Sequence, residues 1–264
     1  MLMDYSLFHV DAFTDTLFKG NPACVVPLEN WLEDAVLLSI AKENAVPETA
    51  FFVQNEDQIH LRWFTPDLEM DLCGHATLAT AHVLKKHLGY DKKMISFTTM
   101  SGIVSVSLSD ELYYLDFPSR MPLETHLPKT LEKALNAKPK SVLKARDYVL
   151  VFDREEDIQN IQIKRTYFDK LDLGTGGVIV TAPGENVDFV SRFFTPRATL
   201  LEDPVTGSAH CSLIPYWASV FSKQEMTAQQ ISERGGQLFC KNQGNRVLIG
   251  GKARTFLKGT FQVR

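Results

Sequence analysis

Two short stretches of this 264-residue chain combine a glycine-led turn with titratable side chains. The first is Gly74-His75-Ala76, and the second is Gly207-Ser208-Ala209, which closely follows Glu202-Asp203. Unpaired backbone N–H groups at a helix start bind anions, and glycine lets the backbone approach a ligand closely. Imidazole, carboxylate and hydroxyl groups beside such a turn can move protons. The pattern therefore predicts a site that binds a carboxylate or a developing enolate and performs acid–base chemistry.

The two stretches belong to an internal repeat. Phe-Thr-Pro triplets begin at Phe64 and Phe194, 130 residues apart, and the Gly-X-Ala triplets begin at Gly74 and Gly207, 133 residues apart. A repeat this long indicates two similar lobes and not a solenoid. We expect lobes at residues 1–118 and 119–264, each with strands around one apolar helix. The last residues could pack back on the first lobe, and both helix N-termini are expected to face one shared cleft.

The segments around these turns follow the patterns of strands and helices. Residues 59–64 alternate as a strand, and residues 76–87 are apolar on most faces, which predicts a helix enclosed by sheet. Asn30 is expected to cap a helix that runs to residue 41. The polar, proline-containing residues 118–139 are the candidate linker. The glycines at 174–177 precede β-branched residues, whereas a dinucleotide fingerprint needs a helix there.

Glu48 stands at the entry of an apolar strand, shortly before the first turn. A solvated carboxylate at the edge of a sheet is an equally good interpretation of its position. Counting through the repeat puts its counterpart near Thr175-Gly176, where the sequence has no carboxylate. The repeat is then symmetric in its anion-binding turns and asymmetric in its acid–base groups. This favours one base that takes a proton and delivers it elsewhere on the same face of a substrate.

Each candidate also has a structural interpretation. His75 could be a buried structural histidine, Ser208 a helix cap, and Glu202-Asp203 acids that complement a helix dipole. Four residues offer thiolate or imidazole ligands for zinc, namely Cys73, His75, His210 and Cys211. Their spacing is not typical of such sites, so we expect no metal. The four cysteines form no Cys-x-x-Cys pair.

Composition limits the class of protein. The hydrophobic fraction is 44%, the charged fraction 23% and the formal net charge −4, which is typical of a globular protein and predicts no nucleic-acid partner. No run of residues is long enough for a membrane span, and the start lacks a signal peptide whether it lies at Met1 or Met3. We therefore expect a cytoplasmic protein with reduced thiols.

The chain resembles the phenazine-biosynthesis PhzF-like family from about residue 5 to its C-terminus. Six motifs carry the resemblance, in the family's order: Asp11-Ala12-Phe13-Thr14, Gly20-Asn21-Pro22-Ala23, Glu48-Thr49-Ala50-Phe51, Arg62-Trp63-Phe64-Thr65-Pro66, Asp71-Leu72-Cys73-Gly74-His75-Ala76-Thr77 and Glu202-Asp203-Pro204-Val205-Thr206-Gly207-Ser208-Ala209. The resemblance implies the α+β, diaminopimelate epimerase-like fold, in which two similar lobes each wrap a curved sheet around a central helix.

The resemblance also implies a function. The characterised phenazine enzyme isomerises trans-2,3-dihydro-3-hydroxyanthranilate without a cofactor, so we expect a cofactor-independent isomerase acting on a small carboxylate, and a homodimer. The expected catalytic residues are Glu48, His75, Asp203 and Ser208, and the expected substrate-binding residues are Asn21, Gly74, Ala76, Thr206 and Gly207. An epimerase or racemase of the same fold and a non-catalytic binding protein are the alternatives.

The chain departs from the family pattern after Ser208-Ala209, where small residues are expected and His210 and Cys211 stand. These two residues could narrow the pocket or change its polarity. The departure therefore argues against the phenazine substrate for this chain. The diaminopimelate epimerases use a pair of cysteines. This chain has Cys73 in one copy but Val205-Thr206 before the glycine in the other, so a two-thiol epimerase is not expected.

Overall fold

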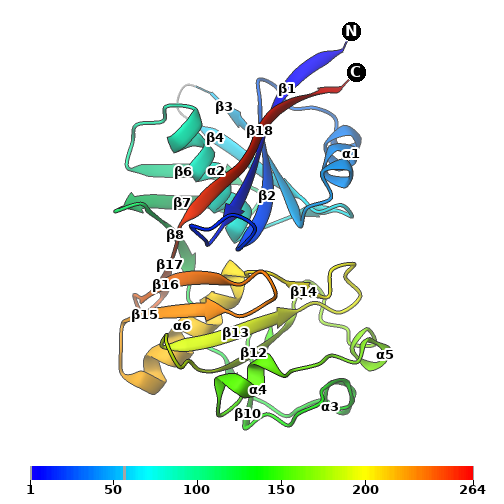
Figure 1. Ribbon diagram of the computed structural model, residues 1–264, viewed down its shortest axis with the longest axis vertical. Coiled ribbons are helices and arrows are strands. Elements are labelled where there is room, and N and C mark those ends of the chain that lie inside the picture. Colours follow the sequence, from blue (N-terminus) through cyan, green and yellow to red (C-terminus); the bar gives the residue numbers. More distant parts are fainter. Residues whose placement is uncertain (1, 56–57, 264) are drawn as a thin grey trace. The chain divides into compact units, whose positions relative to one another are not determined.

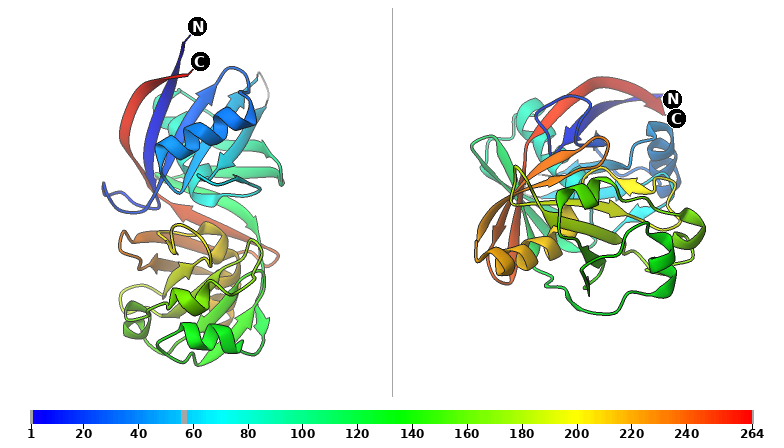
Figure 2. Two further views of the ribbon diagram at one scale, coloured as in Figure 1. Left: turned by 90° about the vertical axis from the view of Figure 1, so that its right-hand side faces the viewer. Right: turned by 60° about the horizontal axis from the view of Figure 1, so that its bottom comes forward.

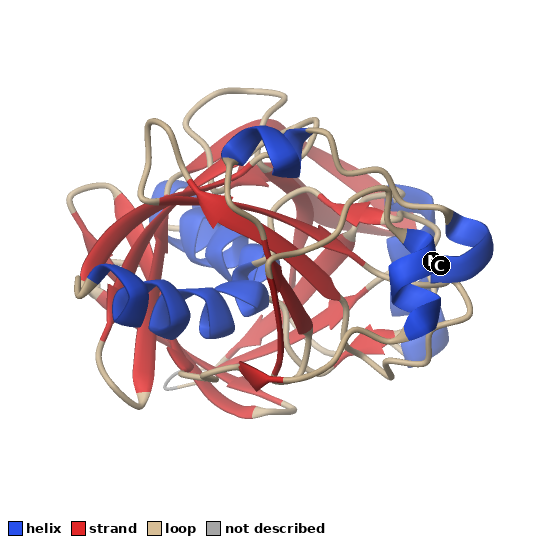
Figure 3. Cartoon of the chain, turned by 90° about the horizontal axis from the view of Figure 1, so that it is seen from below, coloured by secondary structure: helices blue, strands red, loops and turns tan. Residues whose placement is uncertain are grey.

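The computed structural model describes residues 2–55 and 58–263. It divides into two compact units, residues 1–116 with 250–264 and residues 117–249. Strands predominate over helices, and the fold class is α+β (Figures 1 and 3). No helix in the described part of the chain has both the length and the apolar character that crossing a membrane requires.

The first unit contains most of the N-terminal elements and the last strand. They are β1 (Met3–Ala12), β2 (Asn21–Leu28), α1 (Asp34–Asn44), β3 (Glu48–Gln54), β4 (Ile59–Phe64), β5 (Glu69–Met70), α2 (Gly74–His87), β6 (Met94–Thr99), β7 (Gly102–Ser109), β8 (Leu112–Pro118) and β18 (Ala253–Val263). The end of β8 passes into the second unit. Helix α1 lies on the outside of the strands of this unit (Figure 2).

The second unit contains the remaining elements. They are β9 (Leu123–Glu124), α3 (Lys129–Ala134), β10 (Ser141–Lys144), β11 (Tyr148–Val151), α4 (Glu155–Gln159), α5 (Arg165–Phe168), β12 (Val178–Pro183), β13 (Phe189–Phe194), β14 (Glu202–Asp203), α6 (Gly207–Phe221), β15 (Glu225–Gln230), β16 (Gly236–Asn242) and β17 (Arg246–Gly251). The last residues of β17 belong to the first unit.

Both units repeat one order of strand pairings. In the first, β1 and β2 are antiparallel, β2 and β3 parallel, and β3 and β4 antiparallel. Strands β10, β11, β12 and β13 pair in the same directions in the second. Strand β4 then pairs antiparallel with β5 and parallel with β6, as β13 does with β14 and β15. The sequence repeat is therefore a repeat of topology.

Strand register aligns the two copies residue by residue. Thr49 on β3 and Val178 on β12 each pair with the phenylalanine of a Phe-Thr-Pro triplet. Their preceding residues, Glu48 and Gly177, are therefore equivalent. The count from the sequence, which placed the counterpart of Glu48 near Thr175-Gly176, is corrected to Gly177.

Helix α2 forms the core of the first unit. Its residues 74–84 are all buried, and strands β1, β2, β3, β7 and β18 contact it (Figure 1). Small side chains such as Ala76, Ala79 and Ala81 let the strands approach the helix on every side. An all-round buried helix lacks the polar stripe of a surface helix, which confirms the expected helix enclosed by sheet.

Helix α6 forms the corresponding core element of the second unit and contains Pro215. Proline has no backbone N–H, so the carbonyl of Cys211, four residues earlier, loses its helical partner. The backbone N–H of Arg120 donates to that carbonyl at 2.8 Å. The chain following β8 is thus fixed to α6 at the one carbonyl that the proline leaves unpaired.

Two local predictions were wrong. The first helix begins at Asp34 with Glu33 in the cap position and no side-chain cap, so Asn30 does not cap it. Residues 118–139 are not a linker, because they contain β9 and α3, and Leu131 and Ala134 of α3 are buried in the core of the second unit. The prolines suggested a segment without packed structure. The two buried side chains of α3 instead attach these residues to the core of the second unit.

Candidate functional site

A carboxylate and an imidazole meet at the start of α2. Glu48 is the first residue of β3, and His75 is the second residue of α2. Glu48 Oε2 lies 3.2 Å from His75 Nε2, and the side chains are 16% and 5% exposed, respectively. Two of the residues that the sequence singled out for proton transfer are therefore in contact within one unit.

The other side of the His75 ring is also held in place. Asn21 Nδ2 lies 3.2 Å from Nδ1, and Cys73 Sγ lies 3.6 Å from the same nitrogen. When Asn21 donates to Nδ1, the ring proton must be on Nε2, and a charged imidazolium also carries a proton there. In both states Nε2 carries a proton and lies 3.2 Å from the carboxylate of Glu48, without a hydrogen bond between the two atoms. Asn21 can donate to Nδ1 only in the neutral ring, because the imidazolium carries a proton on that nitrogen as well.

The ionisation of His75 follows from its neighbours. Burial alone would lower the pKa of His75, but the contacts with Cys73 and Glu48 more than offset burial and raise the pKa well above its usual value. Burial raises the pKa of the Cys73 thiol, so the sulfur is protonated at neutral pH. Glu48 then supplies the negative charge that stabilises the imidazolium.

Glu48, Cys73 and His75 are also the group that could hold a metal ion among the described residues, since their ligand atoms all lie within 4.8 Å of one another. Coordination would have to replace the contacts seen here, because Sγ approaches Nδ1 and the carboxylate approaches Nε2. His210 and Cys211 join no such group in the described part of the chain.

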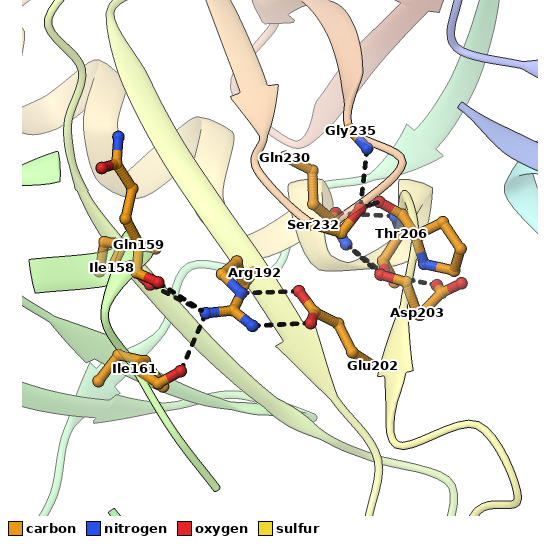
Figure 4. A network of polar contacts seen from close by, with 11 residues as sticks. Ile158, Gln159, Ile161, Arg192, Glu202, Asp203, Thr206, Gln230, Ser232 and Gly235 are labelled. Carbon is orange, nitrogen blue, oxygen red and sulfur yellow. Dashed lines mark hydrogen bonds and ion pairs between the residues drawn. The ribbon is translucent and has the colours of Figure 1, made fainter. Parts of the chain in front are cut away.

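A buried amide fixes the turn before α6. Gln230, which is fully buried, donates to the backbone oxygen of Asp203 at 2.7 Å and accepts from the backbone N–H of Thr206 at 2.8 Å (Figure 4). The hydroxyl of Thr206 donates to Asp203 Oδ2 at 2.5 Å. The turn that contains Asp203 and Thr206 therefore fixes the orientation of the Asp203 carboxylate. Sequence reasoning missed Gln230, because a glutamine at the end of a strand carries no signal of its own.

Ser208 contacts a charged pair that the sequence reasoning did not use. Arg146 Nη2 donates to Ser208 Oγ at 3.0 Å and to Asp147 Oδ2 at 2.9 Å. Asp147 is 1% exposed, and its Oδ1 accepts the backbone N–H of Gly177 at 2.8 Å. A carboxylate therefore lies beside the residue equivalent to Glu48, but an arginine neutralises it. The adjacent Arg-Asp before a strand was the available signal.

His210 and Cys211 point into the core of the second unit. His210 is fully buried, its Nδ1 donates to the Thr206 carbonyl at 2.9 Å, and its ring lies 5.9 Å from that of Phe189. Burial lowers the pKa of His210 to about 4 and raises the pKa of the Cys211 thiol to about 11. Both side chains are therefore neutral at physiological pH and serve packing within this unit.

The structure brings the predicted residues together in two groups, one in each unit. The first group contains Asn21, Glu48, Gly74, His75 and Ala76, and all but Glu48 are buried. The second group contains Asp203, Thr206, Gly207 and Ser208, at the start of α6.

The comparisons with known proteins cover almost the whole chain. The family model described as phenazine biosynthesis-like protein matches residues 10–259. A Pseudomonas aeruginosa protein described as an uncharacterized isomerase is 45% identical, over 99% of this chain and all of its own. The crystal structure of an Enterococcus faecalis PhzF-family protein is 46% identical, with a TM-score of 0.95, over 99% of this chain and 100% of that one.

A more distant structure shows the fold alone. A hydroxyproline epimerase from Agrobacterium vitis is 11% identical, with a TM-score of 0.61, over 98% of this chain and 93% of that one. The expected diaminopimelate epimerase-like α+β fold is confirmed by these likenesses.

Proposed function

Because the chain belongs to the phenazine biosynthesis-like (PhzF-like) family, we propose that it is an isomerase that moves a proton on a small carboxylate substrate by general acid–base catalysis. The observation that supports this proposal best is the contact of 3.2 Å between the largely buried side chains of Glu48 and His75. A carboxylate and an imidazole in such contact form a unit that can accept and return one proton.

The proposed reaction needs one base. Glu48 takes a proton from a carbon that is α or vinylogous to an electron sink, and the electron pair of the broken C–H bond moves into the sink. The backbone N–H groups at Gly74 and Ala76 stabilise the negative charge that develops. Glu48 then returns the proton to a different carbon, so a double bond shifts and no atom is gained or lost. This chemistry uses the protein's own groups, without a cofactor or metal.

His75 controls the proton on Glu48. Its Nε2 lies 3.2 Å from the carboxylate, and Asn21 Nδ2 lies 3.2 Å from the opposite nitrogen. We propose proton movement also for Asp203 and Ser208, and substrate binding for Asn21, Thr206 and Gly207. A single substitution at each residue tests its role. Loss of proton movement should lower the rate of exchange, and loss of substrate binding should lower the affinity.

The repeat favours isomerisation over epimerisation. A two-base epimerase needs a second base matched to the first. The residue equivalent to Glu48 is Gly177, and a Cβ there would lie 2.4 Å from Phe193 Cζ, so a side chain at this position would have to displace its neighbours. Its neighbour Asp147 is buried and paired with Arg146. Epimerase activity, the second candidate, would show itself as inversion at one carbon with no shift of a double bond.

The test is solvent deuterium incorporation into a panel of unsaturated small carboxylates, followed by ¹H NMR in D₂O. We expect Glu48→Gln to lower the rate by about 10²–10⁴-fold and to leave the unfolding midpoint near that of wild type. Glu43→Gln, an exposed glutamate on α1, is the matched control and should exchange at the wild-type rate. Exchange by Glu48→Gln at the wild-type rate would falsify the assignment. Binding of an acid without exchange by wild type would instead support a non-catalytic binding protein.

We further propose that the protein works as a homodimer in the cytoplasm. The dimer is inferred from the family, and sedimentation of the purified protein tests it. The compartment is inferred from four free cysteines that are all buried, a usage typical of reducing surroundings. Export of the native chain from cells would contradict the second inference.

A further inference from the structure

We propose that Arg146 and Ser208 form a carboxylate-binding site in the second unit, and that Arg146 determines which acids bind there. This rests on the proposed function and adds the class of group that the second unit recognises. Four observations carry the inference, and they concern the fixation of Arg146, the direction of its hydrogen bonds, the place of the pair in the repeat and the local charge.

Arg146 is fixed from one side. It lies between β10 and β11, and its Nε lies 3.1 Å from each oxygen of Asp147, while Nη2 is 2.9 Å from Oδ2. Asp147 is itself anchored by the backbone N–H of Gly177. A guanidinium held by a buried carboxylate loses little conformational freedom when it binds a ligand. Arg146 remains 30% exposed, so a ligand can reach it.

The direction of the hydrogen bonds makes Ser208 a donor. Arg146 Nη2 donates to Ser208 Oγ, so the hydroxyl accepts in that bond and its own proton is directed elsewhere. Arg146 Nη1 makes no hydrogen bond to any of the described residues. Two donors, one of them on a cation, therefore stand next to each other. This combination suits a carboxylate oxygen pair and not a neutral donor group.

The repeat relates the position of Ser208 to the contact between Glu48 and His75 in the first unit. In the first unit the equivalent positions carry Glu48 and His75, which lie 3.2 Å apart. In the second unit they carry Gly177 and Ser208, and Phe193 occupies the space that a side chain at Gly177 would need. Asp147, the carboxylate anchored at Gly177, is paired with Arg146. At this position the second copy therefore has hydrogen-bond donors for a ligand where the first copy has a base.

A second arginine contacts the same end of α6 as the pair. The backbone of Arg120 is bound to the Cys211 carbonyl, one turn beyond Ser208, and its buried Nη1 has no hydrogen-bond partner among the described residues. Both guanidiniums act electrostatically on the Cys211 thiol, as does Asp147. Of the three charged groups that act on this thiol, two are cations. The unpartnered Nη1 of Arg120 adds a donor on the same side as Arg146, which favours an anionic ligand over a neutral one.

The experiment is NMR of the guanidinium Nε–H groups of arginine-labelled protein, titrated with benzoate and, separately, with benzamide, its neutral analogue. We expect benzoate to shift the Arg146 signal and benzamide to leave it in place. Arg192, whose guanidinium is already saturated by Glu202, is the internal control and should not shift. An Arg146 signal that ignores benzoate, or that responds equally to benzamide, overturns the proposal.

Variants give the second readout. Arg146→Met should weaken the affinity for benzoate by about tenfold or more, the usual effect of a lost charge-assisted hydrogen bond, and Arg146→Lys should weaken it less. Because Arg146→Met leaves Asp147 buried without its cation, the double variant Arg146→Met/Asp147→Asn repeats the measurement in a neutral background. Wild-type affinity in the double variant contradicts the proposal.

The same titration separates this inference from the proposed function. Glu48→Gln should bind benzoate at Arg146 as wild type does, since Glu48 plays no part in anion recognition there. Loss of deuterium exchange in Glu48→Gln with no benzoate shift at Arg146 would leave the isomerase proposal standing and overturn this one. A benzoate shift at Arg146 together with wild-type exchange by Glu48→Gln would leave this inference standing and overturn the isomerase proposal.

Discussion

Arg192 and Glu202 are joined by two parallel hydrogen bonds, from Nε to Oε1 at 2.7 Å and from Nη2 to Oε2 at 2.8 Å (Figure 4). The first unit repeats this pair as Arg62 and Glu69, with both distances at 2.7 Å. Each arginine also lies over the phenylalanine of its Phe-Thr-Pro triplet, at 5.0 and 5.1 Å. In both units the pair fixes the short strand that leads to the Gly-X-Ala turn.

This relationship predicts that Arg192→Met destabilises the protein by about 2–4 kcal/mol, because a partly buried carboxylate loses its partner. The carbonyls of Ile158 and Ile161 also lose the donor Nη1 of Arg192. Urea unfolding measures the change. Arg154→Met removes a guanidinium that is 67% exposed and paired at the surface, and it should leave the free energy of unfolding unchanged. Equal effects of the two substitutions would contradict the structural role of Arg192.

Gly177 predicts a second effect on stability. Its Cβ would lie 2.4 Å from Phe193 Cζ and 2.8 Å from the Phe194 carbonyl oxygen, so Gly177→Ala should cost about 1–3 kcal/mol through overpacking. Gly259→Ala is the matched control, because the nearest atom there is 3.6 Å away. Thermal unfolding of the two variants side by side checks this. A Gly177→Ala protein as stable as Gly259→Ala would show that the second copy could accommodate a side chain in place of Glu48.

Two buried histidines predict loss of stability in acid. Burial lowers the pKa of both His82 and His210 to about 4, below the usual value of about 6.5. Protonation therefore favours the unfolded chain, so the contribution of each histidine is complete above pH 6.5 and is lost as the pH falls towards 4. Between pH 7 and 5 each should lower the free energy of unfolding by about 2 kcal/mol.

Urea unfolding of wild type and of His210→Gln at the two pH values isolates one of these contributions. The difference between the proteins should shrink at the lower pH. His75 acts with the opposite sign, because its pKa is raised: its contribution is complete below pH 6.5 and is lost as the pH rises through the pKa of the folded state. Parallel pH profiles for wild type and His210→Gln would rule out a neutral buried imidazole.

The cysteines predict chemical inertness of the native protein. Burial raises the pKa of Cys24 to about 12 and that of Cys211 to about 11, and it also raises the pKa values of Cys73 and Cys240. Thiolates, not thiols, react with disulfide reagents. We expect native protein to react at the rate of its unfolding, and all four thiols to react at once in guanidinium chloride. Rapid labelling of Cys73 alone would indicate a thiolate beside His75.

Much of the first unit could be predicted from the sequence because its signals are local. The helix from Gly74 follows from an unbroken apolar run, and the contact between Glu48 and His75 agrees with the position of both at element starts. The repeat itself could be found by counting, since its landmarks are rare triplets. These features depend on residue type and spacing, which the sequence shows directly.

The second unit was harder to predict because its site depends on contacts between distant segments. Arg146 and Asp147 lie 62 and 30 residues from their partners Ser208 and Gly177, and no local pattern indicates these contacts. The register that makes Gly177 the equivalent of Glu48 also depends on strand pairing, which is invisible to a count of residues. His210 looked like a pocket residue by position, yet its Nδ1 bonds one turn back along its own helix.

The pairing of β1 with β18 has a consequence for biosynthesis. Met3 pairs with Val263 and Ala12 with Ala253, so the first and last strands lie side by side (Figures 1 and 2). A chain emerging N-terminus first has the whole second unit available before its last strand exists. All of residues 117–249 are therefore made before β18, and the sheet that holds Glu48 can close around α2 only after the second unit has been synthesised. The order of synthesis accordingly makes the first unit, although it begins the chain, the later of the two to complete its strand pairings.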